Sequence, residues 1–290
     1  MRPEPLEDQE RAVAWSNAEL QVMLACVGAA HRAGLDSHTW KLALFMFNML
    51  LRGGGMREGL EVMKLGLRAA ERDGASIGQI RLLRHVAIMS LHLGLEEDAV
   101  AELGRALALS AELDDPALLA QAHRSMALVC GRLGRYGEAL EHGQVALRRF
   151  EELGNATATV MTRNSVGWYF AHLGRFTEAM EHCRRALEGS RSIGDRFHTA
   201  SALDSIGYIH HCQGDHRTAV TYFREVLDDF ALLTSRHVLS VSAEHLGDAY
   251  HALGELDAAR EAWQRALAIP EGPTPAESDR IRGKLRGVRH

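Results

Sequence analysis

The sequence has little proline, few cysteines and no long apolar run, and each shortage excludes a class of protein. Only six of the 290 residues are proline, and none lies between Ala117 and Ile269, so nothing there interrupts long helices. The four cysteines lie far apart: Cys26, Cys130, Cys183 and Cys212. Because none forms a Cys-x-x-Cys pair, they predict buried reduced thiols rather than a disulfide framework or a zinc site.

Charge and hydropathy exclude further classes. The formal net charge is −5, whereas a nucleic-acid-binding domain is usually basic. The longest apolar run, residues 42–51, contains Asn48 and is shorter than the roughly 20 residues that cross a bilayer. The first residues are polar and acidic, unlike a signal peptide. We therefore expect a soluble, cytoplasmic protein with no membrane segment and no direct contact with nucleic acid.

Catalytic and metal-binding motifs are also missing. Neither a G-x-x-x-x-G-K-[ST] phosphate loop nor a Gly-x-Ser-x-Gly nucleophile elbow occurs. Two carboxylate pairs, at 114–115 and 228–229, are interpreted as helix ends rather than as an acid–base pair. His210, His211 and Cys212 with His216 could suggest a soft-metal site, but their spacing does not force convergence, and packing roles are preferred. We expect no enzymatic activity, no metal and no cofactor.

Small residues, by contrast, recur with a period of forty. The first column comprises Gly54, Gly94, Gly134, Gly174, Gly214 and Gly254. The second, five residues later, comprises Gly59, Ala99, Ala139, Ala179, Ala219 and Ala259. A fixed period between 20 and 50 residues predicts a repeat array, in which each unit packs only on its neighbours.

The last copy shows what one unit contains. Apolar and small residues follow helical spacing over residues 240–252 and again over 256–268, and Leu253-Gly254 separates the two stretches. Gly247 and Ala259 are small enough to let the two helices approach closely. The bulky residues Leu103, Phe223 and Trp263 of the second helices are predicted to lie in the core.

This unit resembles the tetratricopeptide repeat. The resemblance rests on residues of the final copy: Leu246-Gly247, Tyr250, Leu253-Gly254, Ala259, Trp263 and Ala266-Leu267. The period is forty rather than thirty-four, and the extra residues follow Ala-Leu. They are expected to lengthen the second helix by about a turn and a half, before a Gly and a capping Asp or Asn.

The resemblance implies an all-α fold, a right-handed superhelical α-α solenoid of six helix pairs. Residues 1–36 are expected to form an N-terminal entry helix. Residues 270–290 are expected to form a proline-containing joint, a C-terminal capping helix and a basic tail. The six repeats are expected at about 37–75, 76–115, 116–155, 156–195, 196–235 and 236–269.

A second resemblance lies before the first repeat. Ala14-Trp15, Glu19, Met23 and Trp40 are similar to the segment that opens the C-terminal repeat region of Streptomyces antibiotic regulatory protein (SARP)-type transcription regulators, which also carry a STAND-type ATPase. It implies a non-catalytic sensing and protein-interaction region that controls secondary metabolism, with its own ATPase module among the partners. The alternative is a stand-alone adaptor or peptide receptor without an ATPase. We expect the helix around Trp15 and Met23 either to form a homodimer surface or to pack on the first repeat.

In the tetratricopeptide family the first helix of each pair lines a concave groove. The residues assigned to it are Arg81, Arg84, Arg124, Arg132, Asn164, Trp168, Asp204, Tyr208, His211, Glu244, Asp248 and His251. Because their charge runs from basic to acidic, we expect a peptide or partner helix to bind with polarity, its acidic residues at the arginines and its basic residues at the carboxylates. The alternative is a set of solvated helix faces. The basic tail is interpreted as the outside of the capping helix, the alternative being contact with nucleic acid or an acidic partner.

Overall fold

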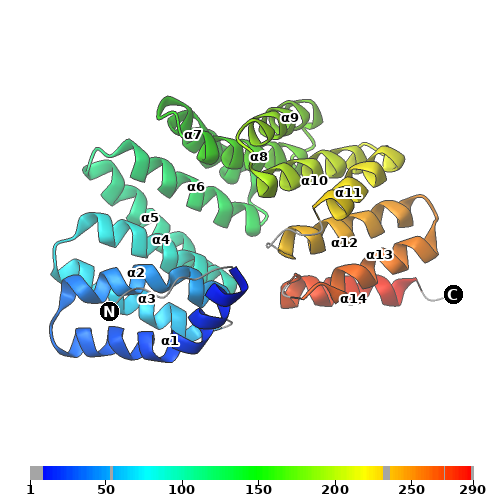
Figure 1. The fold of residues 1–290 in the computed structure, drawn as a ribbon. Helices are drawn as coiled ribbons and strands as arrows, with labels where there is room; N and C mark the ends of the chain where they lie inside the picture. Colours follow the sequence, from blue (N-terminus) through cyan, green and yellow to red (C-terminus); the bar gives the residue numbers. More distant parts are fainter. Residues whose placement is uncertain (1–8, 53–54, 231–235, 271, 289–290) are drawn as a thin grey trace. The chain divides into compact units, whose positions relative to one another are not determined.

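The computed structural model describes residues 9–52, 55–230, 236–270 and 272–288, and every regular element in these ranges is an α-helix (Figure 1). The predicted all-α class is confirmed. The helices are α1 (Gln9–Arg32), α2 (Asp36–Arg52), α3 (Met56–Arg72), α4 (Ser76–His92), α5 (Glu96–Glu112), α6 (Pro116–Arg132), α7 (Tyr136–Glu152), α8 (Ala156–His172), α9 (Phe176–Ser192), α10 (Arg196–Cys212), α11 (His216–Asp229), α12 (Arg236–Ala252), α13 (Leu256–Ala268) and α14 (Pro275–Gly287). None of these helices is long and apolar enough to cross a membrane.

The forty-residue period comes from two equal halves. Helices α4 and α5 both have 17 residues, because α5 continues past Ala106 to Glu112. A three-residue turn follows each of these two helices, so this pair with its two turns spans forty residues. The turn after α4 places Gly94 at φ +74°, and Leu95 N–H donates to the Ser90 carbonyl at 2.9 Å. This left-handed glycine closes the helix end.

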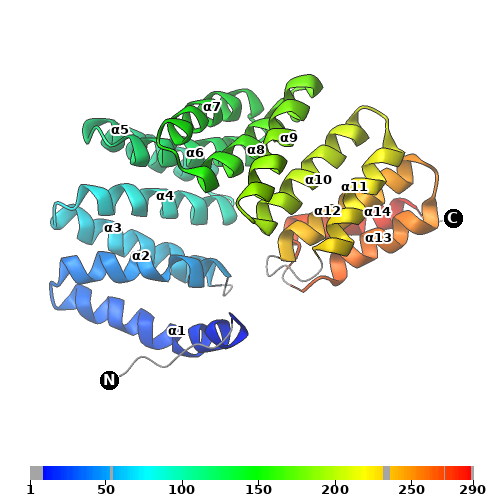
Figure 2. The ribbon, with the colours of Figure 1, turned by 45° about the horizontal axis from the view of Figure 1, so that its top comes forward.

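The chain divides into two compact units, Met1–Arg135 and Tyr136–His290. The first unit contains α1 to α6 and the second contains α7 to α14. Within a unit each helix packs on the next one in sequence, and the first helices of neighbouring pairs also touch: α2 with α4, α4 with α6, α8 with α10, and α10 with α12 (Figures 1 and 2). The division falls inside the stretch expected to form the third repeat.

Small residues let bulky side chains fill the space between paired helices. Leu103, Phe223 and Trp263 are buried, which confirms the prediction that they belong to the core. A Cβ atom added to Gly247 would lie only 2.4 Å from Cδ1 of Trp263. The indole cannot easily retreat, because its Nε1 donates a hydrogen bond to Asp248 at 3.0 Å.

Gly247→Ala is therefore expected to destabilise the second unit by about 1–3 kcal/mol through overpacking. Gly104→Ala is the matched control, since Gly104 lies on the exposed side of α5 and an added Cβ meets no atom within 4 Å. It should stabilise the chain by about 0.5–1 kcal/mol, because alanine favours a helix more than glycine does. Denaturant unfolding followed by tryptophan fluorescence measures both. Equal effects of the two substitutions would contradict the packing argument.

One sequence interpretation changes with the structure, and another holds. Cys130 and Cys183 are buried as predicted, but Cys26 and Cys212 are exposed, so the expectation of buried thiols is wrong for these two. Among the carboxylate pairs, Asp115 caps α6 by accepting from the backbone N–H groups of residues 117 and 118.

Candidate functional site

Five residues stand forty apart on the first helices and form one column: Arg84, Arg124, Asn164, Asp204 and Glu244. Members of this column contact the neighbouring repeat. Within the first unit, Arg84 of α4 donates to Gln121 and Ser125 of α6. In the second unit, Asp204 of α10 accepts from Ser242 of α12, and Glu244 of α12 accepts from Arg280 of α14. Only 7%, 5% and 3% of Arg84, Asp204 and Glu244 are exposed. The column thus lies between first helices rather than on an open face.

The other residues assigned to the groove are more accessible. Arg81, Arg132 and His251 are exposed. The remaining six are partly buried: Arg124, Asn164, Trp168, Tyr208, His211 and Asp248. Arg81, Arg84, Arg124 and Arg132 belong to the first unit, and the other eight residues belong to the second.

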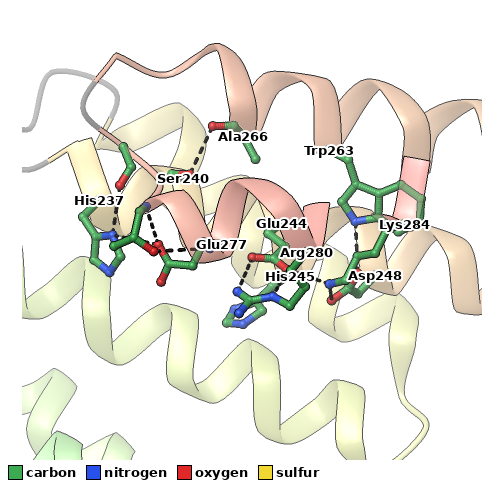
Figure 3. Close-up of polar contacts among 12 residues, drawn as sticks. His237, Ser240, Glu244, His245, Asp248, Trp263, Ala266, Glu277, Arg280 and Lys284 are labelled. Carbon is green, nitrogen blue, oxygen red and sulfur yellow. Dashed lines mark hydrogen bonds and ion pairs between the residues drawn. The ribbon is translucent and has the colours of Figure 1, made fainter. Parts of the chain in front are cut away.

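The acidic end of the column binds the C-terminal helix. Glu244 accepts from both Nε and Nη2 of Arg280 at 2.8 Å and from Nζ of Lys284 at 2.7 Å, and the same Nζ lies 2.6 Å from Asp248 (Figure 3). Burial alone would raise the pKa of Glu244, but the hydrogen bonds and charges of Arg280 and Lys284 lower it to about 2. Lys284 stands forty residues after Glu244, so α14 continues the column.

The basic tail is therefore largely engaged within the chain. Arg280 and Lys284 bind α12, and Arg282 pairs with Asp279 on its own helix at 3.0 Å. Arg286 is exposed, and Arg289 lies outside the described residues. The carboxylates of Glu244 and Asp248, which the sequence assigned to basic groups of a ligand, already hold basic groups of α14.

A buried polar network connects α10 to α12. Ser242 Oγ donates to Oδ1 of Asp204 at 2.7 Å, and Nδ1 of His245 lies 3.1 Å from the same oxygen. Burial by itself lowers the pKa of His245, but the negative charge and hydrogen bond of Asp204 outweigh it, so the pKa of His245 is raised. Sequence inspection missed His245, since only its place one residue after the column marks it.

Aromatic rings and histidines gather beside this network. The rings of Trp168 and Tyr208 lie 4.5 Å apart, and His245 lies 5.3 Å from Tyr208. A pocket of about 500 Å³ opens next to them, lined by Tyr208, His211, Cys212, Phe223, His245 and Asp248. Although Cys212 is exposed, partial desolvation raises the pKa of its thiol, so this sulfur stays protonated and is a poor nucleophile.

The histidines pack against rings. His210 stacks on Tyr222, and His182 lies 5.4 Å from the ring of Phe170. Among the described residues, no group of three or more His, Cys, Asp or Glu side chains is placed to hold a metal ion.

Two family models match the chain, both described as tetratricopeptide repeat. One matches residues 78–152 and 157–230, and the other matches residues 212–275. No curated protein matches the chain.

Several solved structures share the fold. The apo form of RapI has a TM-score of 0.66 at 15% identity, with 95% of this chain and 97% of that chain covered. A Rap protein complexed with competence and sporulation factor has a TM-score of 0.65 at 15% identity, covering 96% and 75%. A STAND protein with a tetratricopeptide repeat sensor from Pyrococcus horikoshii has a TM-score of 0.60 at 18% identity. This last match covers 98% of the present chain but only 42% of the STAND protein.

Proposed function

We propose, since the chain belongs to the tetratricopeptide repeat family, that it is a non-catalytic module that binds a peptide or protein partner along its first helices. The observation that carries this proposal is the pocket beside Tyr208 in the second unit. Its volume of about 500 Å³ falls in the range of ligand sites, which combine apolar walls with a few polar groups.

The lining of the pocket defines what can enter. Tyr208 and His245 contribute partly exposed rings, the ring of Phe223 is buried in the wall, and Asp248 adds one carboxylate. Rings supply large contact areas, and the carboxylate favours a donor or a cation. The pocket therefore suits one apolar or aromatic side chain of a partner that also presents an N–H or cationic group.

At the level of the whole protein, we propose that this module is the sensing region of a bacterial transcription regulator of the SARP type, which controls antibiotic biosynthesis. Two observations support it: the segment around Trp15 and Met23, and the likeness to a STAND protein that carries a tetratricopeptide repeat sensor. Partner binding would then shift the equilibrium of an attached ATPase by its differential affinity for the two states. The DNA sequence upstream of this coding region tests the proposal. An in-frame phosphate-loop domain encoded there would support it.

A stand-alone adaptor or peptide receptor is the second proposal. One support is the likeness to RapI, since the match covers 97% of the RapI chain. The other is the likeness to the Rap protein solved with competence and sporulation factor. A short reading frame without an ATPase domain would favour this proposal over the first.

A pocket-filling substitution tests the binding site. Cys212→Phe adds a ring at the pocket lining and should abolish capture of a partner from native lysate, because the ring occupies the space that the partner's side chain needs. Cys26→Phe is the matched control, since Cys26 is also exposed but lies on α1. Capture is measured by pull-down and mass spectrometry. A partner retained equally by wild type and by Cys212→Phe would exclude the pocket as its site.

A further inference from the structure

Helix α1 has two apolar faces, and only one of them packs on the chain. Leu20, Met23 and Leu24 lie against the hydrophobic core of the first unit. The other face, here called the outer seam, consists of six exposed residues: Trp15, Ala18, Val22, Ala25, Cys26 and Ala29. Most of them follow one another at intervals of three or four residues, which is the spacing of a seam between two helices, and none carries a charge.

Helix α3 shows what covers this face in an inner repeat. Because α3 stands forty residues after α1, Val22, Cys26 and Ala29 correspond to Val62, Gly66 and Ala69. Gly66 and Ala69 are buried, whereas Cys26 and Ala29 are exposed. The first helix of the pair, α2, packs here, and a Cβ atom added to Gly66 would lie 2.6 Å from Cβ of Ala43. Among the described residues no helix stands in this relation to α1.

Helix α2 is open at the same end of the first unit. Phe45 is 66% exposed, the largest fraction among the big hydrophobic side chains of the described residues. Its counterpart forty residues later, His85 of α4, is half-buried and stacks on Phe47 of the preceding first helix, with ring centroids 3.7 Å apart. A helix that lies on the outer seam as α2 lies on α3 would therefore cover Phe45 as well.

The last helix of the second unit presents a different surface. The exposed residues of α14 include Asp279, Arg282 and Arg286. Such a polar outer face is what keeps a terminal repeat soluble. The outer seam and Phe45 lack this polar character, and a contiguous exposed apolar patch marks an interaction site.

The outer seam is complementary to a second copy of itself. In an antiparallel pair of α1 helices related by a two-fold axis at Val22, each residue faces the residue equally far on the other side of Val22. Trp15 then faces Ala29 of the second copy, Ala18 faces Cys26, and Val22 faces Val22. The large side chain meets a small one, the small residues let the helices approach closely, and no two charges meet.

We propose that the outer seam and Phe45 form a homodimer interface, in which α1 of each copy takes the place that a first helix occupies in an inner repeat. The interface continues the helix packing that already joins α2, α3 and α4 within the chain. It is separate from the pocket of the second unit, so the two proposals stand or fall independently.

Sedimentation velocity on the full chain tests the dimer. Wild type should sediment as a dimer at micromolar concentration. Val22→Glu should weaken the dimer at least about a hundredfold, because it places two carboxylates against each other at the two-fold axis. Ile77→Glu is the matched control, since Ile77 is a branched residue of α4 that is 49% exposed, close to the 56% of Val22. Circular dichroism should show the same helix content in all three proteins. A monomeric wild type, or equal weakening by Ile77→Glu, would overturn the proposal.

Disulfide trapping tests the antiparallel arrangement. The background is Cys212→Ser, which removes the other exposed cysteine. Adding Ala18→Cys should give a covalent dimer on a non-reducing gel, because position 18 faces Cys26 of the second copy. Cys212→Ser alone should give none, since the two copies of Cys26 are eight residues apart along the pair, about 12 Å at 1.5 Å per residue. A covalent dimer from Cys212→Ser alone, or none with Ala18→Cys, would contradict the two-fold axis at Val22.

Discussion

Asp204→Ala is expected to lower the free energy of unfolding of the second unit by about 3–5 kcal/mol. The substitution leaves the buried Ser242 hydroxyl and the His245 imidazole without the carboxylate that both now contact. Only 7% of the Asp204 side chain and 15% of the His245 side chain are exposed, so water replaces these bonds poorly. Denaturant unfolding followed by the fluorescence of Trp168 and Trp263 measures the loss.

The loss should depend on pH in a defined direction. Because Asp204 raises the pKa of His245 above its ordinary 6.5, the pair contributes fully below pH 6.5. Its contribution falls as the pH rises through the raised pKa. The difference between wild type and Asp204→Ala is therefore larger at pH 6 than at pH 9. Asp228→Ala, at an exposed residue near the end of α11, is the control and should change stability by less than about 0.5 kcal/mol. Equal effects at the two positions would contradict the network.

Glu244→Gln is expected to weaken the docking of α14 by about 2–3 kcal/mol. The amide cannot accept the charge-assisted bonds from Arg280 and Lys284 as the carboxylate does. Hydrogen exchange should show faster exchange in α14, with little change in α8 or α9. Amide exchange read by mass spectrometry on peptides of residues 275–287 measures this effect.

Acid should produce the same undocking in wild type. The pKa of Glu244 is lowered from 4.5 to about 2, so its contribution is complete above pH 4.5 and is lost as the pH falls towards 2. Glu244→Gln should lack this transition. Arg286→Met is the control, because it removes one positive charge from the same helix at an exposed position. If Arg286→Met loosens α14 as much as Glu244→Gln does, the general charge of α14 rather than these ion pairs holds it.

The repeats could be predicted from the sequence because small residues recur every forty positions. Gly94 and its equivalents mark left-handed helix ends, and Gly247 opposite Trp263 marks close packing, so both signals are local. The burial of Arg84 and Glu244 was not predictable. A column on one helix face points either into a groove or towards the next first helix, and a small rotation of the helix decides which.

The pocket could not be predicted from the sequence for a related reason. Tyr208 and Cys212 come from α10, Phe223 from α11, and His245 and Asp248 from α12. Sequence spacing within one helix indicates a face, but it does not show which residues of three helices meet. The pairing of Lys284 with Glu244 could have been suspected, because the two residues stand one full period apart with opposite charges.

The most direct test of partner binding is site-specific photocrosslinking in native lysate. A benzophenone side chain is placed at His251, which is exposed on the first helix α12, or at Glu181, which is exposed on the second helix α9. We predict a discrete protein or peptide adduct from His251 and none from Glu181, with the adduct lost when Cys212→Phe is added. An adduct from Glu181 alone, or adducts of equal yield that persist with Cys212→Phe, would contradict binding along the first helices.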